Sequence, residues 1–200
     1  MNEKIQNYVV AQAPKVGQFC QALTSESDRG CALFAAAYLD VCLSDLLCIS
    51  LVENKNTDKD LFEGTAPLST FSSRIKLAYY LGLISRNCRR DLDIVRGIRN
   101  DFAHKPEIIS FETQSIRDRC KNLSFSYQEK DADLRSHFTA AVMRVLSHIH
   151  IATLTTTPHT EKPDDTPSEE DKKGERELIE KIVKKIPSDS FIQEESTEEA

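Results

Sequence analysis

The feature that most constrains this chain is a long stripe of apolar residues that recurs with the period of an α-helix. Between Arg29 and Glu53 apolar side chains return about every 3.6 residues, in a stripe broad enough for a helix that packs on more than one side. The stripe comprises Cys31, Phe34, Ala35, Tyr38, Val41, Cys42, Leu46 and Ile49, and Asp45 interrupts it. Nowhere does the alternation typical of strands persist long enough for a sheet. The chain is therefore predicted to be all-α.

Weaker periodic stretches predict the remaining helices. They cover residues 2–23, 71–81, 86–104, 112–123 and 131–154, while residues 108–111 form a candidate extended piece. Pro14 would kink or split the first helix, because proline lacks the backbone donor that a helix interior needs. Ser69 or Thr70 and Ser85 are suited to capping two helix starts, and Gly82 suits a helix C-terminus.

These segments predict a single bundle of about five to six helices with a disordered C-terminal tail. The expected divisions are an N-terminal helix in residues 1–24, a helical domain in 25–155 and an acidic tail in 156–200. The core is expected to contain Phe34, Tyr38, Val41, Ile75, Leu92, Val95 and Phe102.

The acidity of the chain is concentrated in the tail. Residues 157–200 carry fourteen acidic and seven basic side chains, whereas the remainder is close to neutral. Such a polar segment cannot bury enough apolar surface to fold alone. An amphipathic helix is nevertheless predicted near residues 175–186, and Ser168 and Asp171 have the spacing of a capping box. This helix either binds a partner or docks on its own chain, or it forms only transiently.

The overall composition limits the classes of function. A nearly neutral folded part argues against strong non-specific binding of nucleic acid. We find no segment long and apolar enough to cross a membrane and no apolar signal core, so we expect a cytoplasmic protein whose six cysteines are reduced thiols. No C-x-x-C pair is present, and His137, His148 and His150 are poorly spaced for one ion. We therefore expect neither a metal nor a cofactor.

Several blocks of the chain resemble, in order, the bacterial mannitol operon repressor (MltR-like) family. The resemblance spans roughly residues 25–154, and its blocks are Arg29–Leu33, Phe71–Ser85, Asp91–His104, Phe111 and Ile116–Leu123. It implies an all-helical domain linked to transcriptional regulation. The sequence contains no convincing helix-turn-helix with a basic recognition helix. The resemblance therefore implies a regulator that acts through a protein partner, and we expect a homodimer without direct sequence-specific DNA binding.

The segment from Ile98 to His104 also resembles a second family of helical proteins. Arg99, four intervening residues and His104 match the R-x4-6-H pattern of HEPN domains, many of which are ribonucleases, and Asn100 fits this pattern too. This resemblance implies an alternative function as a metal-independent ribonuclease or RNA-binding protein. The histidine would move a proton of the ribose and the arginine would stabilise the phosphate. Five residues turn a helix by about 500°, so the two side chains would diverge by roughly 140° unless two subunits combine them.

A structural or interaction role is the competing interpretation of the same residues. Asn100 and His104 could hold neighbouring loops by hydrogen bonds, and Arg99 could pair with Asp45. Farther towards the N-terminus lies a cluster of basic residues, which either binds phosphate, an acidic partner or the protein's own tail, or is an ordinary solvated helix face. Its members are Lys76, Arg86, Arg89, Arg90 and Arg96.

Overall fold

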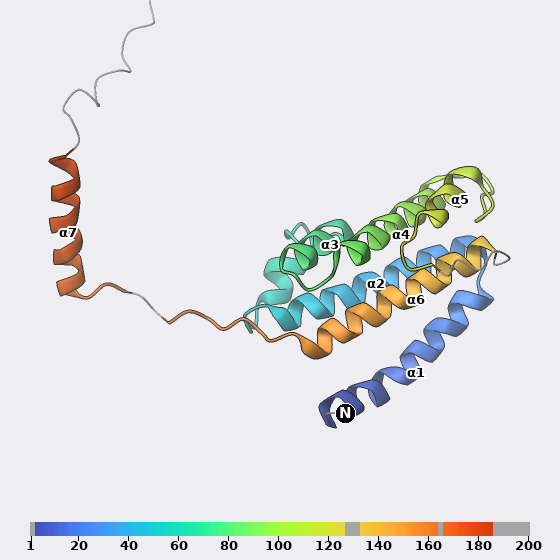
Figure 1. The fold of residues 1–200 in the computed structure, drawn as a ribbon, viewed down its shortest axis with the longest axis horizontal. Coiled ribbons are helices and arrows are strands. Elements are labelled where there is room, and N and C mark those ends of the chain that lie inside the picture. The colour runs from blue at the N-terminus through green and yellow to red at the C-terminus, as the bar shows by residue number, and fades with distance from the viewer. Residues whose placement is uncertain (1–2, 127–132, 164–165, 186–200) are drawn as a thin grey trace, which may run out of the picture. The chain divides into compact units, whose positions relative to one another are not determined.

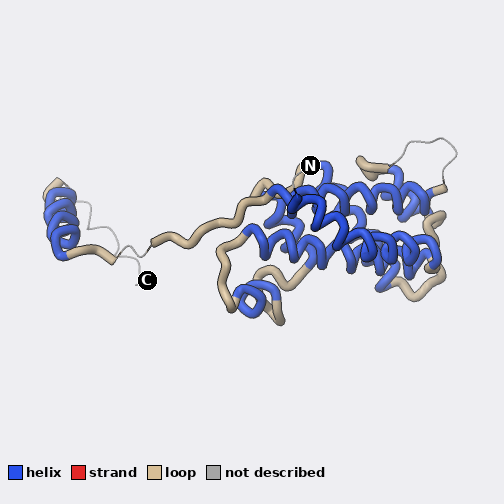
Figure 2. Tube along the Cα trace, turned by 90° about the horizontal axis from the view of Figure 1, so that it is seen from below, coloured by secondary structure: helices blue, strands red, loops and turns tan. Residues whose placement is uncertain are grey.

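A computed structural model describes residues 3–126, 133–163 and 166–185, and within these ranges the chain contains helices and loops but no strand (Figure 2). The α-helices are α1 (Glu3–Ser25), α2 (Asp28–Ser50), α3 (Phe71–Tyr80), α4 (Arg86–His104), α5 (Gln114–Lys121), α6 (Leu134–Thr155) and α7 (Glu169–Val183). A short π-helical turn, η1, covers Asp58–Phe62. The all-α prediction is confirmed.

Helix α2 is the centre of the bundle. It contacts α1, α3, α4 and α6, as the cyan and blue ribbon in Figure 1 shows. Three of its apolar residues, Leu39, Leu43 and Leu46, are completely buried. This position explains the width of its apolar stripe, because neighbours on several sides each need an apolar surface to pack against.

The predicted core is correct for four residues and wrong for two. Ile75, Leu92, Val95 and Phe102 are buried, whereas Phe34 is 40% exposed and Val41 is 59% exposed. Tyr38 is half-buried, with its ring stacked on Phe19 of α1 at a centroid distance of 4.2 Å. Phe34 and Val41 lie at the edge of the broad stripe, beyond the strip of α2 that its neighbours cover.

Helix α2 also corrects the prediction that no segment is apolar enough to cross a membrane. By length and composition alone it would pass as a membrane-spanning helix, and it is the one such helix in the described part of the chain. Its contacts with four other helices account for this composition, since the central helix of a bundle needs similar residues.

Several helix ends are fixed by capping residues that the sequence predicts. The side chains of Thr70 and Ser85 accept hydrogen bonds from the backbone N–H groups of Ser73 and Cys88, so both predicted caps form. Gly82 has a φ of 73° and ends α3 in a Schellman motif, in which the Leu83 N–H donates to the Ala78 carbonyl at 2.9 Å. Helix α1 continues through Pro14 and is not split.

Residues 162–200 form a unit of their own, separate from residues 1–161. Within it α7 begins earlier than the helix predicted near 175–186, and Ser168 and Asp171 form the predicted capping box. Its apolar residues Leu178, Ile179 and Ile182 are all more than half exposed. Ile186, the last apolar residue of the predicted stripe, lies outside the described residues.

Candidate functional site

Helix α4 carries most of the basic cluster and the Arg99–His104 segment, and its two faces differ sharply. One face is buried and consists of Cys88, Asp91, Leu92, Val95, Ile98 and Phe102. The other face carries arginines near its start and the Arg99–His104 segment at its end. Burial of the apolar face fixes the rotation of the helix, and this rotation decides which polar side chains face outward.

The C-terminal end of α4 is held by an arginine from the start of α2. The Arg29 guanidinium donates to the carbonyl of Phe102, and it donates at 3.1 Å to each of the carbonyls of Lys105 and Glu107. A helix leaves its last carbonyls without partners inside the helix, so a cation placed here satisfies them and also favours the helix dipole. Arg29 therefore fixes both the end of α4 and the chain that follows it.

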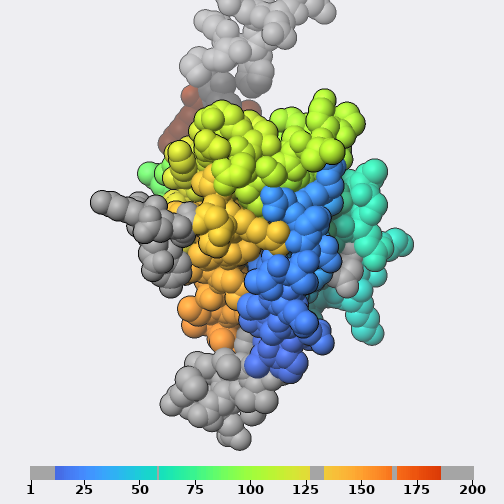
Figure 3. All heavy atoms as spheres, turned by 90° about the vertical axis from the view of Figure 1, so that its right-hand side faces the viewer, coloured from blue at the N-terminus to red at the C-terminus, as the bar shows by residue number. Residues whose placement is uncertain are grey.

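The preceding residue, Asp28, reinforces this arrangement. Its carboxylate accepts a hydrogen bond from the Phe111 N–H at 3.0 Å and from the Arg135 guanidinium of α6 at 3.1 Å. The segment from Lys105 to Thr113, which we call the α4–α5 loop, is thus tied to α2 at several points. In Figure 3, which views this end of the bundle, the yellow-green chain lies over the blue start of α2.

The α4–α5 loop exposes an apolar side chain that nothing in the described chain covers. Ile108 is 103% exposed, which is the largest value among the large apolar residues whose exposure the structure describes, and the adjoining His104, Pro106 and Glu107 are exposed as well. Residues 108–111 form no strand, because the loop turns at Phe111 to begin α5. Phe111 is itself buried, with its ring 5.5 Å from that of Phe102.

The predicted residues Arg99, Asn100 and His104 all lie on α4, but they have different surroundings. Arg99 and Asn100 are half-buried, whereas His104 is the exposed last residue of the helix. Because α4 is continuous from Arg86 to His104, the five-residue spacing turns Arg99 and His104 roughly 140° apart. One chain therefore does not align them on one face of the helix.

The suggested pairing of Arg99 with Asp45 is wrong, since the carboxylate on which Arg99 acts is Asp40. Burial raises the pKa of Asp40, while Arg74, hydrogen-bonded to it at 2.8 Å, and Arg99 lower it. Asp45 instead lies in a small pocket with Lys15 and His150, between α1 and α6. Asp40 and Asp45 are five residues apart in α2 and thus point towards different neighbours.

The basic cluster lines a groove at the other end of α4. We call it the arginine groove; it has a volume of about 600 Å³. It is lined by Tyr79, Arg86, Arg89, Arg90, Asp93, Ile94, Gly97 and Arg119. Arg119 of α5 was not part of the predicted cluster, and its guanidinium reaches the groove by passing close to Gly97, where a Cβ would lie 3.2 Å from its nitrogen. Two members of the predicted cluster do not line the groove: Lys76, which is exposed on α3, and Arg96, which pairs with Asp93 on α4.

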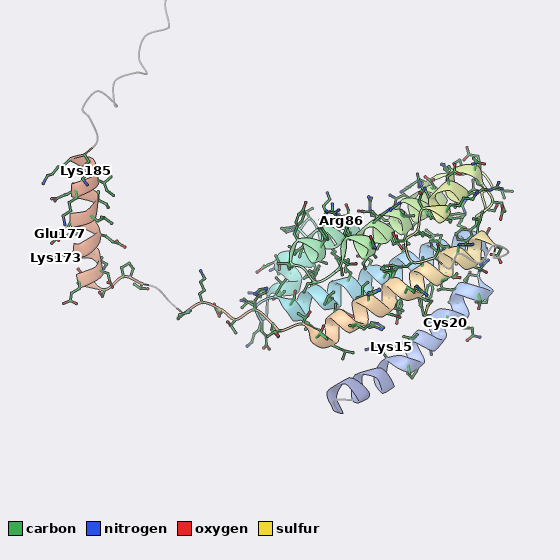
Figure 4. All side chains as sticks on the ribbon, in the orientation of Figure 1. Lys15, Cys20, Arg86, Lys173, Glu177 and Lys185 are labelled. Carbon is green, nitrogen blue, oxygen red and sulfur yellow. The ribbon has the colours of Figure 1, made fainter. Side chains whose placement is uncertain are left out.

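Positive charge exceeds negative charge in the arginine groove. Among the described residues Asp93 is the one carboxylate that lines it. Asp93 lies 3.9 Å from Arg89 and 3.6 Å from Arg96, and the Arg89 guanidinium stacks over the Tyr79 ring at 4.6 Å. Arg119 pairs with Asp101 at 3.1 Å. Within the described residues no carboxylate lies within ion-pair distance of Arg86 or Arg90. These two cations are therefore open to a negatively charged ligand (Figure 4 labels Arg86).

Sequence reasoning missed three positioning residues, Asp28, Arg29 and Asp91. Asp91 is completely buried, and its carboxylate accepts hydrogen bonds from the N–H groups of Ser124 and Phe125 at 2.8 and 2.9 Å, which fixes the chain after α5. The sequence did contain a signal for Asp91, because this charged residue stands at a position of α4 where the helical period requires an apolar one. Asp28 and Arg29 gave a weaker signal, because charged residues are common at helix starts.

The cysteines and histidines form no evident reactive centre. In the described ranges no group of three potential ligands is placed to hold a metal ion. All six cysteines are free thiols. Burial raises the pKa of Cys31 to about 11 and that of Cys88 and Cys120 to about 12, so these thiols remain protonated at neutral pH.

This geometry describes a helical module with one braced loop and one basic groove, and comparison with known proteins identifies its family. The chain belongs to the mannitol repressor (MtlR) family, whose sequence model matches residues 54–165. A chain in the X-ray structure of the MtlR–HPr complex from Escherichia coli has a similar fold, with a TM-score of 0.55 and 19% sequence identity. The similarity covers 73% of this chain and 98% of that one. Comparison with curated proteins gave no match.

Proposed function

We propose that this chain is a regulatory binding module of transcription that acts in the cytoplasm through a protein partner rather than by reading DNA. Its membership of the mannitol repressor family supports the regulatory role. The similar fold in the MtlR–HPr complex supports a protein partner, and HPr is the partner to test first. Direct base readout is not part of the proposal, because the sequence contains no convincing helix-turn-helix with a basic recognition helix.

The observation that carries this proposal is the exposed Ile108 on the braced α4–α5 loop. An apolar side chain that is fully exposed in the free protein gains favourable free energy when a partner covers it. The hydrogen bonds from Arg29 and to Asp28 hold the loop in one conformation, so little conformational entropy is lost on binding. Neighbouring His104 and Glu107 supply the polar rim that protein interfaces usually have.

The proposal is tested by titrating the purified full-length chain with HPr from the same organism in a calorimeter. We expect saturable binding that weakens by about thirtyfold or more in Ile108→Asp, the loss typical of a central interface residue. The matched control is Ile151→Asp, which places the same change at another exposed isoleucine, on α6. Absence of wild-type binding would remove HPr as the partner, and equal affinity of the two variants would remove the loop as the docking surface.

A ribonuclease built on Arg99 and His104 is the alternative function. The exposed position of His104 at the end of α4 favours it, because an RNA ribose can reach the imidazole. Since one helix turns Arg99 away from His104, this chemistry requires His104 of one copy beside Arg99 of a second copy. It therefore also requires the homodimer predicted from the sequence.

The ribonuclease alternative is tested by incubating the chain with labelled RNA in the presence of EDTA. The alternative expects metal-independent cleavage that disappears in both Arg99→Ala and His104→Ala while the circular dichroism spectrum is unchanged. A mixture of the two inactive variants would regain activity if each site combines residues of two copies. The binding-module proposal expects that the wild-type protein leaves the RNA intact.

A further inference from the structure

We propose that the arginine groove binds a free nucleotide that carries at least two phosphates. This surface is distinct from the α4–α5 loop, so the inference does not depend on the partner proposed there. In the described chain the lining residues all come from α3, α4 and α5, which belong to the same unit, residues 1–161. A nucleotide combines phosphates with a flat aromatic base, and the groove offers a suitable surface to each of these parts.

The helical period brings the arginines of the groove together. The lining residues of α4 follow Arg86 at i+3, i+4, i+7, i+8 and i+11, which places them on one side of the helix. Arg119 enters from α5 and pairs with Asp101 at 3.1 Å, so its guanidinium is already oriented. Arg86, which Figure 4 labels, and Arg90 are exposed and have no carboxylate within ion-pair distance in the described chain. Both lie near the N-terminal end of α4, where the helix dipole also favours an anion.

The balance of charge in the groove favours a small ligand with more than one negative charge. Among the described residues four arginines and one aspartate line it. Guanidinium groups bind phosphate oxygens through two parallel hydrogen bonds, so neighbouring arginines can share one phosphate. The volume of about 600 Å³ is typical of small-molecule sites. A strand of RNA would instead need a basic track that continues beyond the groove, whereas the chain outside the acidic tail is close to neutral.

An exposed aromatic ring beside the arginines provides a surface for the base. Tyr80 is 74% exposed, and the Arg89 guanidinium lies 5.5 Å from the centre of its ring. The Tyr79 ring meets the Tyr80 ring edge to face at 5.4 Å and carries Arg89 over its own face, so these contacts hold Tyr80 next to the groove. Bases stack favourably on aromatic side chains whatever their identity. The ring therefore favours a nucleotide over a simple phosphate and predicts little preference among bases.

The experiment titrates the purified full-length chain with ADP, GDP and UDP in a calorimeter, with pyrophosphate and adenosine as partial ligands. We expect all three nucleotides to bind saturably, pyrophosphate to bind about tenfold more weakly, and adenosine not to bind. Tyr80→Ala should reduce the affinity for ADP to that for pyrophosphate and leave the affinity for pyrophosphate unchanged, because only the base contacts this ring.

Reversal of charge in the groove tests the phosphate part of the site. Arg86→Glu/Arg90→Glu should weaken the binding of ADP and of pyrophosphate by about tenfold or more, because the reversed charges repel both. The matched control is Lys55→Glu/Lys59→Glu, which makes the same change in net charge at two exposed lysines outside the groove.

Several results would overturn the proposal. They are the absence of saturable binding by all three nucleotides, equal affinities for ADP and pyrophosphate in the wild type, and equal losses in the groove and control variants. A short single-stranded RNA that binds through Arg86 and Arg90 much more tightly than ADP would also overturn it, because the groove would then belong to RNA.

Discussion

The two ends of helix α4 differ in how their charged groups are used. At the C-terminal end, Arg29 donates to backbone carbonyls and Asp28 accepts from Phe111 and Arg135, so charge is used to fix the chain. At the N-terminal end, Arg86 and Arg90 have no carboxylate within ion-pair distance in the described chain. Charge that is satisfied internally determines conformation, whereas charge that is left open is available for ligands. The difference predicts that mutations at the two ends will separate stability from binding.

The largest expected effect is that of Arg29→Ala. It removes the donor for three carbonyls at the end of α4, and hydrogen bonds to charged groups are among the stronger ones, so the free energy of unfolding should fall by about 3 kcal/mol. Chemical denaturation measures the loss, with Arg90→Ala as the matched control at the open end. Equal losses in the two variants would show that the ends do not differ as described.

A smaller loss is expected for Asp91→Ala, in the buried face of α4. The N–H groups of Ser124 and Phe125 would lose their acceptor, which should cost about 2 kcal/mol. Asp91→Asn should lose less, because the amide oxygen can still accept one of the two hydrogen bonds. Thermal unfolding measures the order of the two variants. Hydrogen exchange should also accelerate at Ser124 and Phe125 before it does elsewhere, and unchanged exchange there would contradict this role.

Stability at alkaline pH should show that the inner face of the first turn of α4 is buried, although Arg86 and Arg90 on its outer face are exposed. Cys88 lies in the first turn, yet its burial raises the pKa of the thiol from 9.0 to about 12. Folding favours the protonated thiol, so its contribution is complete below pH 9 and is lost as the pH rises towards 12. By pH 10 about 1 kcal/mol of this contribution has been lost. Cys88→Ala should therefore lose less stability between pH 8 and pH 10 than the wild type, and parallel pH profiles would refute this.

The smallest effect is expected for the double variant Arg86→Ala/Arg90→Ala. Exposed side chains without partners contribute little to folding, so the free energy of unfolding should change by less than about 0.5 kcal/mol. A loss of stability comparable to that of Arg29→Ala would mean that these arginines hold the fold rather than a ligand.

The sequence sufficed for the helices because each carries its own local signals. Ser85 predicted the start of α4, Gly82 the end of α3, and Ser168 with Asp171 the start of α7, since capping depends on residues only a few positions apart. Because these signals are local, they do not report which side chains distant helices cover, and this explains the two errors in the predicted core. Whether Phe34 and Val41 are covered depends on how far α1 and α6 extend over α2, and no periodicity reports that distance.

The candidate site was predictable only in part for a related reason. The basic cluster was visible because Arg86, Arg89 and Arg90 are close in sequence and share a helix. Arg119 was not, because it enters the groove from α5. Arg29 acts on residues more than seventy positions away, and Asp40 replaced Asp45 as the neighbour of Arg99 because only the packing of three helices decides which face meets which.

The pair Asp28 and Arg29 has a consequence for the motions of the bundle. Two adjacent residues connect the start of α2 to the end of α4, to the α4–α5 loop and, through Arg135, to the start of α6. These segments should consequently open to solvent together, as one cooperative unit, rather than fray one by one. A partner that approaches Ile108 would then meet a surface ordered during folding, so association should proceed without a slow conformational step.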